Sequence, residues 1–272
     1  MAERRSDRLA DRLAEMPVDD INRVPRVTVD FWLIKLMAVT MGETAADYLA
    51  VNMGLGLTVT SIIMTAILIG AIVLQFAQRR YVPSVYWLAV VLISVVGTLV
   101  TDNLTDNFGV PLLSSTIFFS IALMITFILW KAREGTLSIH SIFTARREAF
   151  YWLVVLFTFA LGTAVGDLIS EVFGFGYITT GLIFGAIIAA IAFAHFAFRL
   201  DGILAFWLAY IFTRPLGASL GDYLSQPSDY GGLGLGTIYT SLMFLAIIIF
   251  IVIYMSFNYE PEIEGSPGEP LR

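Results

Sequence analysis

The sequence contains no cysteine and only two histidines, His140 and His195, among its 272 residues. Without thiols the chain can form no disulfide bond, no thiolate metal site and no thiol nucleophile. His195 lies near the end of an apolar stretch that holds no second histidine, so we expect a packed or interfacial side chain there rather than a haem or metal ligand. We therefore predict no cofactor and no catalytic residue.

Charged residues are also scarce, at 14% of the chain, whereas hydrophobic residues make up 58% and the mean hydropathy is +0.81. A soluble core cannot bury that much apolar surface, and this composition is typical of a polytopic membrane protein whose main partner is the lipid bilayer. The net charge of −6 leaves no basic field that would attract a nucleic acid, so we predict none as a partner.

Eight apolar stretches are each close to the ~20 residues that a helix needs to cross a bilayer. They lie at 31–52, 57–77, 84–105, 111–130, 149–171, 177–198, 203–225 and 236–257. Lys and Arg occur in the segments that follow the second, fourth and sixth stretches and at the N-terminus, and they are missing from the other four connections. Since basic residues collect on the cytoplasmic side, both termini are predicted to be cytoplasmic.

A repeated motif organises these stretches. It reads GETAADYL at 42–49, GTLVTDNL at 97–104, GTAVGDLI at 162–169 and GASLGDYL at 217–224, and a tryptophan precedes each aspartate by fifteen residues. The motif predicts an all-α protein in which a two-helix unit occurs four times, as parallel repeats around an axis along the membrane normal. We divide the chain into an N-terminal segment (1–30), repeats 1 and 2 (31–130), a cytoplasmic link (131–148), repeats 3 and 4 (149–257) and an acidic tail (258–272). Residues 1–20 are expected to form a short cytoplasmic or interfacial helix.

The fourfold unit, with an aromatic-Trp pair at its start (FWLIK at 31–35) and Gly-x4-Asp at its end, resembles a family of bacterial inner-membrane proteins defined by four copies of a repeat of unknown function. The resemblance covers nearly all of residues 24–257. It implies the four-repeat architecture and a bacterial inner membrane, and it implies no activity.

Ionisable side chains inside the predicted spans are the candidate functional residues, because charge within a membrane is costly and commonly marks an ion or proton pathway. If the tryptophans mark the inner interface, the four aspartates share one level near the outer face and suggest a ring. Its predicted members are Glu43, Asp47, Asp102, Asp167 and Asp222; Arg214 and Lys35 are the predicted counter-charges; and Ser94, Thr98, Asp106, Thr163 and Glu171 are the predicted secondary lining. Glu43 has no acidic counterpart in the other copies, and we expect it to face Arg214.

This constellation favours a transporter or channel for a small hard cation, such as a divalent metal, an alkali ion or a proton. Carboxylate and hydroxyl ligands without Cys or His suit such ions, and the same carboxylates would bind a carried metal. Two alternatives stay open. The Asp and Arg network could only fix helix packing in a structural or sensory membrane protein, as the motif glycines would allow, or the protein could be a membrane-embedded enzyme. The sequence does not determine the oligomeric state.

Overall fold

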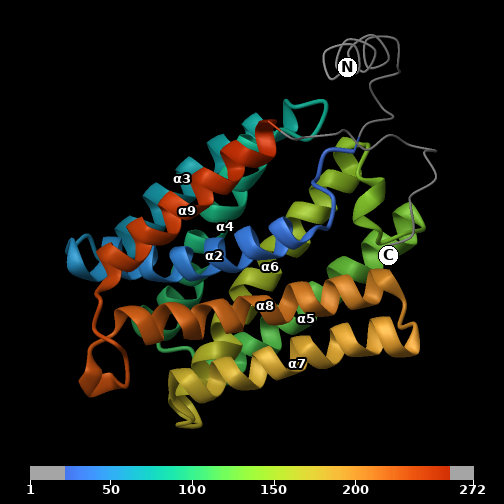
Figure 1. Ribbon diagram of the computed structural model, residues 1–272. Coiled ribbons are helices and arrows are strands. Elements are labelled where there is room, and N and C mark those ends of the chain that lie inside the picture. Colours follow the sequence, from blue (N-terminus) through green and yellow to red (C-terminus); the bar gives the residue numbers. More distant parts are fainter. Residues whose placement is uncertain (1–21, 258–272) are drawn as a thin grey trace.

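Eight α-helices make up most of residues 22–257, the part of the chain described by the computed structural model (Figure 1). They are α2 (Val29–Asp47), α3 (Leu57–Phe76), α4 (Pro83–Asp102), α5 (Leu112–Glu134), α6 (Ala145–Asp167), α7 (Gly176–Phe198), α8 (Gly202–Ser225) and α9 (Thr237–Phe257). No strand occurs in these residues. The helix predicted within 1–20 and the acidic tail lie outside the described residues.

Four of the eight helices, α2, α4, α6 and α8, begin at a capping side chain or a proline. The side chains of Thr28, Thr144 and Asp201 accept hydrogen bonds from the backbone N–H groups of the first turns of α2, α6 and α8. Pro83 opens α4, where its missing N–H costs nothing. Gly135, at φ 74°, ends α5. These caps satisfy backbone groups that would otherwise lie unpaired near the ends of apolar segments.

Seven of the eight helices are long and apolar enough to cross a membrane, and α2 is the exception. Helix α2 holds four charged residues, Asp30, Lys35, Glu43 and Asp47, and the side chains of Lys35 and Glu43 are buried inside the protein. The helix therefore directs two of its charges toward other helices. Eight membrane spans remain a prediction.

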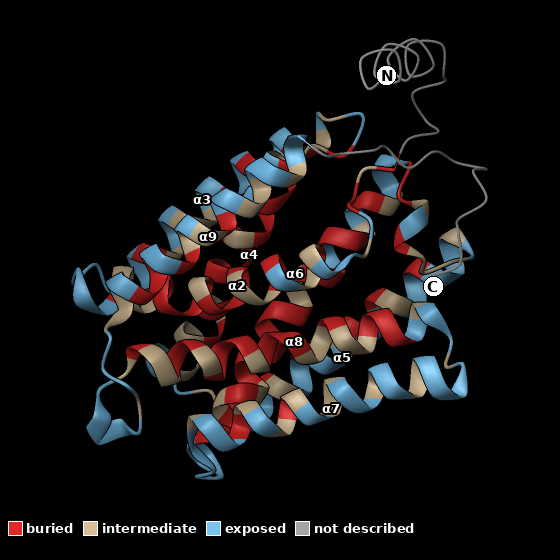
Figure 2. Ribbon diagram, in the orientation of Figure 1, coloured by how far each residue is buried: buried red, intermediate tan, exposed pale blue. Residues whose placement is uncertain are grey.

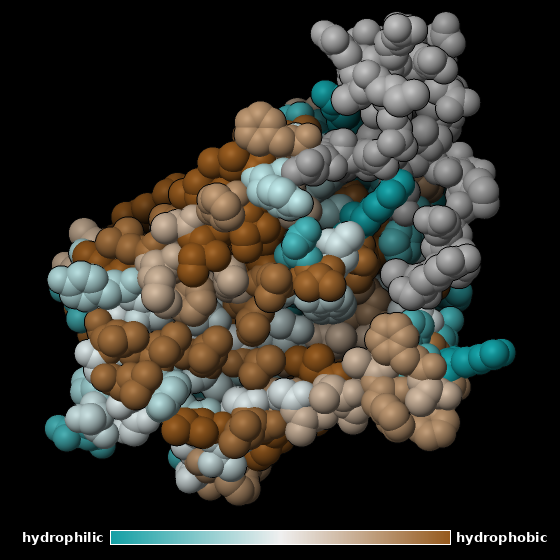
Figure 3. Space-filling model, in the orientation of Figure 1, coloured by the Kyte–Doolittle hydropathy of each residue, from teal (hydrophilic) through white to brown (hydrophobic). Residues whose placement is uncertain are grey.

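The helices form two layers, which Figure 2 shows through their burial. The four inner helices, α2, α4, α6 and α8, are largely buried and contact one another in a closed order, α2 with α4, α4 with α6, α6 with α8, and α8 with α2. The four outer helices, α3, α5, α7 and α9, are mostly exposed. Figure 3 shows hydrophobic side chains gathered over the face that includes α3, α9, α8 and α7, with hydrophilic side chains toward the ends, as expected for a membrane protein.

Each outer helix packs on the inner helix that follows it in sequence. Thus α3 lies on α4, α5 on α6, and α7 on α8, and the last outer helix, α9, packs on the first inner helix, α2. The final repeat therefore closes the arrangement on the first one.

The motif glycines lie where neighbouring inner helices approach most closely. A Cβ atom at Gly42 would overlap Ser94, one at Gly97 would overlap Phe159, one at Gly162 would overlap Arg214, and one at Gly217 would overlap Val39. Every one of these neighbours stands eight residues before the aspartate of the next repeat. The glycine of one repeat therefore makes room for a side chain of the following repeat, and the fourth glycine makes room for the first repeat.

Three of the four motif tryptophans lie in the protein interior, and Trp32 is half-buried. Trp87, Trp152 and Trp207 are buried among other aromatic side chains at the end of the inner helices away from the aspartates. We call this group the aromatic cluster; it comprises Phe31, Tyr86, Trp87, Tyr151, Trp152, Phe206, Trp207 and Tyr210. The hydroxyls of Tyr86 and Tyr151 lie 2.5 Å apart within it. The aromatic-Trp pairs thus fill the protein interior, where their area contributes to packing.

Candidate functional site

A cavity of about 180 Å³ lies between the inner helices at the end opposite the aromatic cluster. Its wall is built from equivalent positions of the four repeats, namely the aspartates Asp47, Asp102, Asp167 and Asp222 and the residues four positions later, Val51, Asp106, Glu171 and Gln226. Residues four apart share one helix face, so the two tiers lie one above the other. The structure therefore brings the four predicted aspartates around one space.

Exposure falls from the mouth of the cavity to its floor. Asp106 and Glu171 are exposed, Asp47 is half-buried, Asp222 is 9% exposed, and Glu43 is 5% exposed. All seven acidic residues among these positions line the cavity, and no basic residue lines it. Carboxylic acid side chains thus line the cavity from mouth to floor.

A π-helical turn follows the aspartate in three of the four inner helices. These turns are Tyr48–Asn52 after Asp47, Asn103–Asn107 after Asp102, and Leu168–Val172 after Asp167. Wider π-helical turns are uncommon and occur frequently at functional sites. Helix α8 differs because it continues as an α-helix past Asp222 to Ser225, and the next residue, Gln226, donates a hydrogen bond from Nε2 to Asp47 Oδ2 at 3.1 Å.

Six lining residues were not among the predicted site residues: Val51, Leu57, Thr105, Leu112, Tyr177 and Gln226. Leu57, Leu112 and Tyr177 stand in the first turns of α3, α5 and α7, three residues before the buried hydroxyl residues Thr60, Ser115 and Thr180. That shared spacing is a signal in the sequence that could have identified them. Three of the outer helices, α3, α5 and α7, thus contribute a residue of their first turn to the cavity lining.

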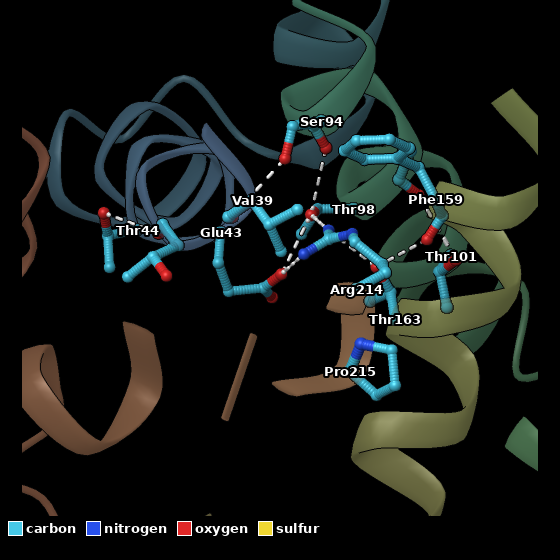
Figure 4. A network of polar contacts seen from close by, with 12 residues as sticks. Val39, Glu43, Thr44, Ser94, Thr98, Thr101, Phe159, Thr163, Arg214 and Pro215 are labelled. Atoms are coloured by element: carbon cyan, nitrogen blue, oxygen red, sulfur yellow. Dashed lines mark hydrogen bonds and ion pairs between the residues drawn. The ribbon is translucent and has the colours of Figure 1, made fainter. Parts of the chain in front are cut away.

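Arg214 lies beneath the floor and is completely buried (Figure 4). Its Nη1 forms an ion pair with Glu43 Oε2 at 2.9 Å, and its Nη2 donates to the hydroxyls of Thr98 and Thr163, the latter at 2.8 Å. Thr98 Oγ1 in turn donates to Glu43 Oε2 at 3.0 Å. We call Glu43, Thr98, Thr163 and Arg214 the arginine network. It joins all four inner helices in one layer, and the expected contact between Glu43 and Arg214 is present.

Lys35 is buried one layer further from the cavity. Its Nζ donates to the backbone carbonyl of Tyr210 at 2.9 Å and lies 4.0 Å from the centre of the Tyr210 ring. Among residues 22–257 it forms no ion pair with a carboxylate. A carbonyl and an aromatic face therefore hold this ammonium group, and Lys35 contacts none of the acidic residues that it was predicted to balance.

The predicted secondary lining separates into three groups. Asp106 and Glu171 line the mouth of the cavity. Thr98 and Thr163 belong to the arginine network below the floor. Ser94 does not line the cavity, because its hydroxyl lies against Gly42 and is directed at the carbonyl oxygen of Val39 at 3.4 Å. Although Ser94 lies on the aspartate face of α4, its side chain contacts α2 and not the cavity.

The carboxylates surround the cavity without converging. Within the part of the chain that the structure describes, no three Asp, Glu or His side chains are grouped closely enough to hold one metal ion. The arrangement can attract a cation by its charge, but it offers no compact set of ligands that would replace the water shell of a divalent metal. An ion in this space would keep part of its hydration.

A closed set of apolar helices around an acidic cavity defines a multi-pass α-helical membrane protein. A scan against family models finds the Repeat of Unknown Function (DUF347) at residues 31–81, 85–136, 150–201 and 205–258. The chain belongs to this family, which confirms the four-copy repeat inferred from the sequence. Comparisons with curated proteins and with solved structures give no match.

Proposed function

We propose that the protein is a transporter or channel for a small hard cation, and that the acidic cavity is where the cation enters. The observation that carries the proposal is the composition of the cavity wall, which has seven carboxylic acid residues and no basic residue. Enclosed acidic surfaces concentrate cations, and carboxylate and amide oxygens suit divalent metals, alkali ions and protons.

The proposed pathway has an open and a closed end. The cavity mouth is lined by the exposed Asp106 and Glu171, whereas the arginine network and the aromatic cluster block the space below Glu43. Because Lys and Arg collect in the connections at the aromatic end, that end is assigned to the cytoplasm and the cavity to the opposite side of a bacterial inner membrane. In this form of the proposed transporter, a cation would reach Glu43 from outside and pass no further.

The arginine network supports the alternative in which buried charges only fix helix packing. This support applies to the layer of residues below the cavity floor. The network's ion pair and hydrogen bonds link all four inner helices, and a buried ion pair can fix helix packing without taking part in transport. The two layers therefore receive different roles: the aspartates attract the cation, and the arginine network seals the floor and joins the inner helices. The enzyme alternative gains no observation of this kind.

The test is cation flux into proteoliposomes that contain the purified protein. Uptake would be measured for magnesium, manganese, calcium, potassium and sodium ions, and for protons under an imposed pH gradient. We expect flux of at least one of these ions, and at least about a tenfold loss in the double variant Asp102→Asn, Asp167→Asn, because each substitution removes one of the charges that concentrate the ion.

The control is Asp229→Asn, which replaces one aspartate in the exposed connection between α8 and α9 and leaves the cavity intact. Its flux should equal that of the wild type. A folded wild-type protein that moves none of these ions would overturn the transport proposal. Equal flux in the double variant and in Asp229→Asn would show that transport does not require Asp102 and Asp167.

A further inference from the structure

A second hollow lies on the outer surface at the opposite end of the molecule, between the last turns of α5 and the first turns of α6. It has a volume of about 350 Å³ and is lined by Leu129, Arg133, Arg146, Ala149, Phe150 and Leu153. We call it the α5–α6 groove. It shares no residue with the acidic cavity, and its wall is mostly apolar with two arginines at one end.

Most guanidinium nitrogens of the two groove arginines form no ion pair within the described residues. Arg133 is exposed and forms no ion pair or hydrogen bond with another residue of the described chain. Arg146 uses Nε to pair with Glu134, while 69% of its side chain stays exposed. The same glutamate is also held by Arg147 at 3.0 Å, so a single carboxylate is shared between two arginines.

The charge around the groove is strongly positive. Residues 131–147 hold four basic side chains, Lys131, Arg133, Arg146 and Arg147, and one acidic side chain, Glu134, which leaves a net charge of +3. The whole chain carries −6, so this excess is local. An anion is the ligand that complements such a site.

The rest of the groove fits an acyl chain. Leu129 and Leu153 are 48% and 41% exposed, and Phe150 lies beside them with its ring stacked on the buried Trp130. The groove runs from these residues to the arginines at the helix ends, where a membrane changes from hydrocarbon to headgroup. Free phosphate would use only the arginines, whereas a phospholipid would also cover the apolar wall.

We propose that the α5–α6 groove binds an anionic phospholipid, with its phosphate held by Arg133 and Arg146 and an acyl chain lying along Leu129, Phe150 and Leu153. Guanidinium groups bind phosphate oxygens in a bidentate geometry, and basic pockets between transmembrane helices recognise anionic headgroups in this way. The inference does not depend on cation transport.

The experiment measures binding of phosphatidylglycerol to the full-length protein in a neutral detergent by native mass spectrometry, with phosphatidylcholine of the same chain length as the comparison lipid. We expect the wild type to bind phosphatidylglycerol in preference. Substitution of Arg133→Gln together with Arg146→Gln should weaken that binding by roughly fivefold for each arginine, or about 25-fold in total. Arg133→Gln alone removes no contact within the described chain, so it tests the site even if the double variant folds poorly.

Two controls separate the proposal from its alternatives. Arg79→Gln with Arg80→Gln removes the same charge from the exposed connection between α3 and α4 and should leave lipid binding unchanged. Ala149→Trp keeps both arginines but fills the apolar wall, so it should also weaken lipid binding. Equal losses in the Arg79 and Arg80 control, equal binding of phosphatidylcholine, or displacement of the lipid by millimolar inorganic phosphate would each overturn the proposal.

Discussion

Arg214 shows how one residue breaks the equivalence of four repeats. Its position is held by Val39, Ser94 and Phe159 in the other copies, and each of these side chains lies over the glycine of the preceding repeat. Only the arginine is long enough, and carries the charge, to reach Glu43 and two threonines on the other inner helices. A single substitution in a repeated contact thus produces the only buried Arg–Glu ion pair among the inner helices of residues 22–257.

Removing the anion from this pair should destabilise the protein strongly. Glu43→Gln leaves the guanidinium of Arg214 buried without its carboxylate, and breaking a buried ion pair on one side costs about 3–5 kcal/mol. Thermal unfolding of the purified protein should therefore begin at a clearly lower temperature than in the wild type.

The double variant Glu43→Gln, Arg214→Met should recover part of the loss, because it removes both charges together. Equal thermal stability of Glu43→Gln and the wild type would contradict the ion pair as a packing element. A double variant no more stable than Glu43→Gln would show that the penalty does not come from the unpaired arginine.

At the scale of the elements, the inner helices approach one another through glycines, and the outer helices supply the apolar surface. The Gly-x4-Asp spacing places each glycine about 1.4 turns before its aspartate, so the close packing lies at a level below the widening of the cavity. The π-helical turns then follow the aspartates in α2, α4 and α6. A tight contact and a wider turn on the same helix together define where the cavity begins.

Adding one methyl group at these contacts should separate two inner helices. Gly97→Ala would bring Cβ within 2.8 Å of the Phe159 Cβ and 3.3 Å of the Ala160 nitrogen, and overpacking of this kind costs about 1–3 kcal/mol. Thermal unfolding should shift to lower temperature.

Gly185→Ala is the matched control, because nothing lies within 4 Å of a Cβ at that position on α7. It should be neutral or slightly stabilising, since alanine is the better helix former by about 1 kcal/mol. Equal shifts for the two variants would mean that the contact between α4 and α6 does not require glycine.

At the scale of the whole molecule, charge is separated between the two ends. The acidic cavity occupies one end of the inner helices, while the basic residues of 131–147 and the aromatic cluster lie at the other. The same asymmetry supports the proposed orientation in the membrane and the two proposed ligands, a cation at one end and an anionic lipid at the other.

The orientation can be tested directly because the chain has no cysteine. Ser228→Cys lies in the connection between α8 and α9, and Ser84→Cys lies in the first turn of α4; both serines are exposed. In intact spheroplasts a membrane-impermeant maleimide should label the first variant and not the second. After lysis both should react, and labelling of the second variant alone before lysis would reverse the orientation.

The sequence determined much of this site through local rules. Hydropathy located the helices, and the repeat register brought the aspartates and the residues four positions later onto matching helix faces, which the cavity lining reflects. It also predicted that Glu43 faces Arg214, because these are the two charged residues on that face without counterparts in the other copies.

Only the tertiary structure decided which helices meet. Helical periodicity gives the face of a residue but not the neighbour that the face meets, so Ser94 was expected in the lining and instead packs against Gly42 of α2. Trp87, Trp152 and Trp207 are likewise buried, since the closed order of the inner helices creates an interior large enough for the aromatic cluster. Register and composition are properties of one helix, whereas burial and the choice of partner arise when four helices close on one another.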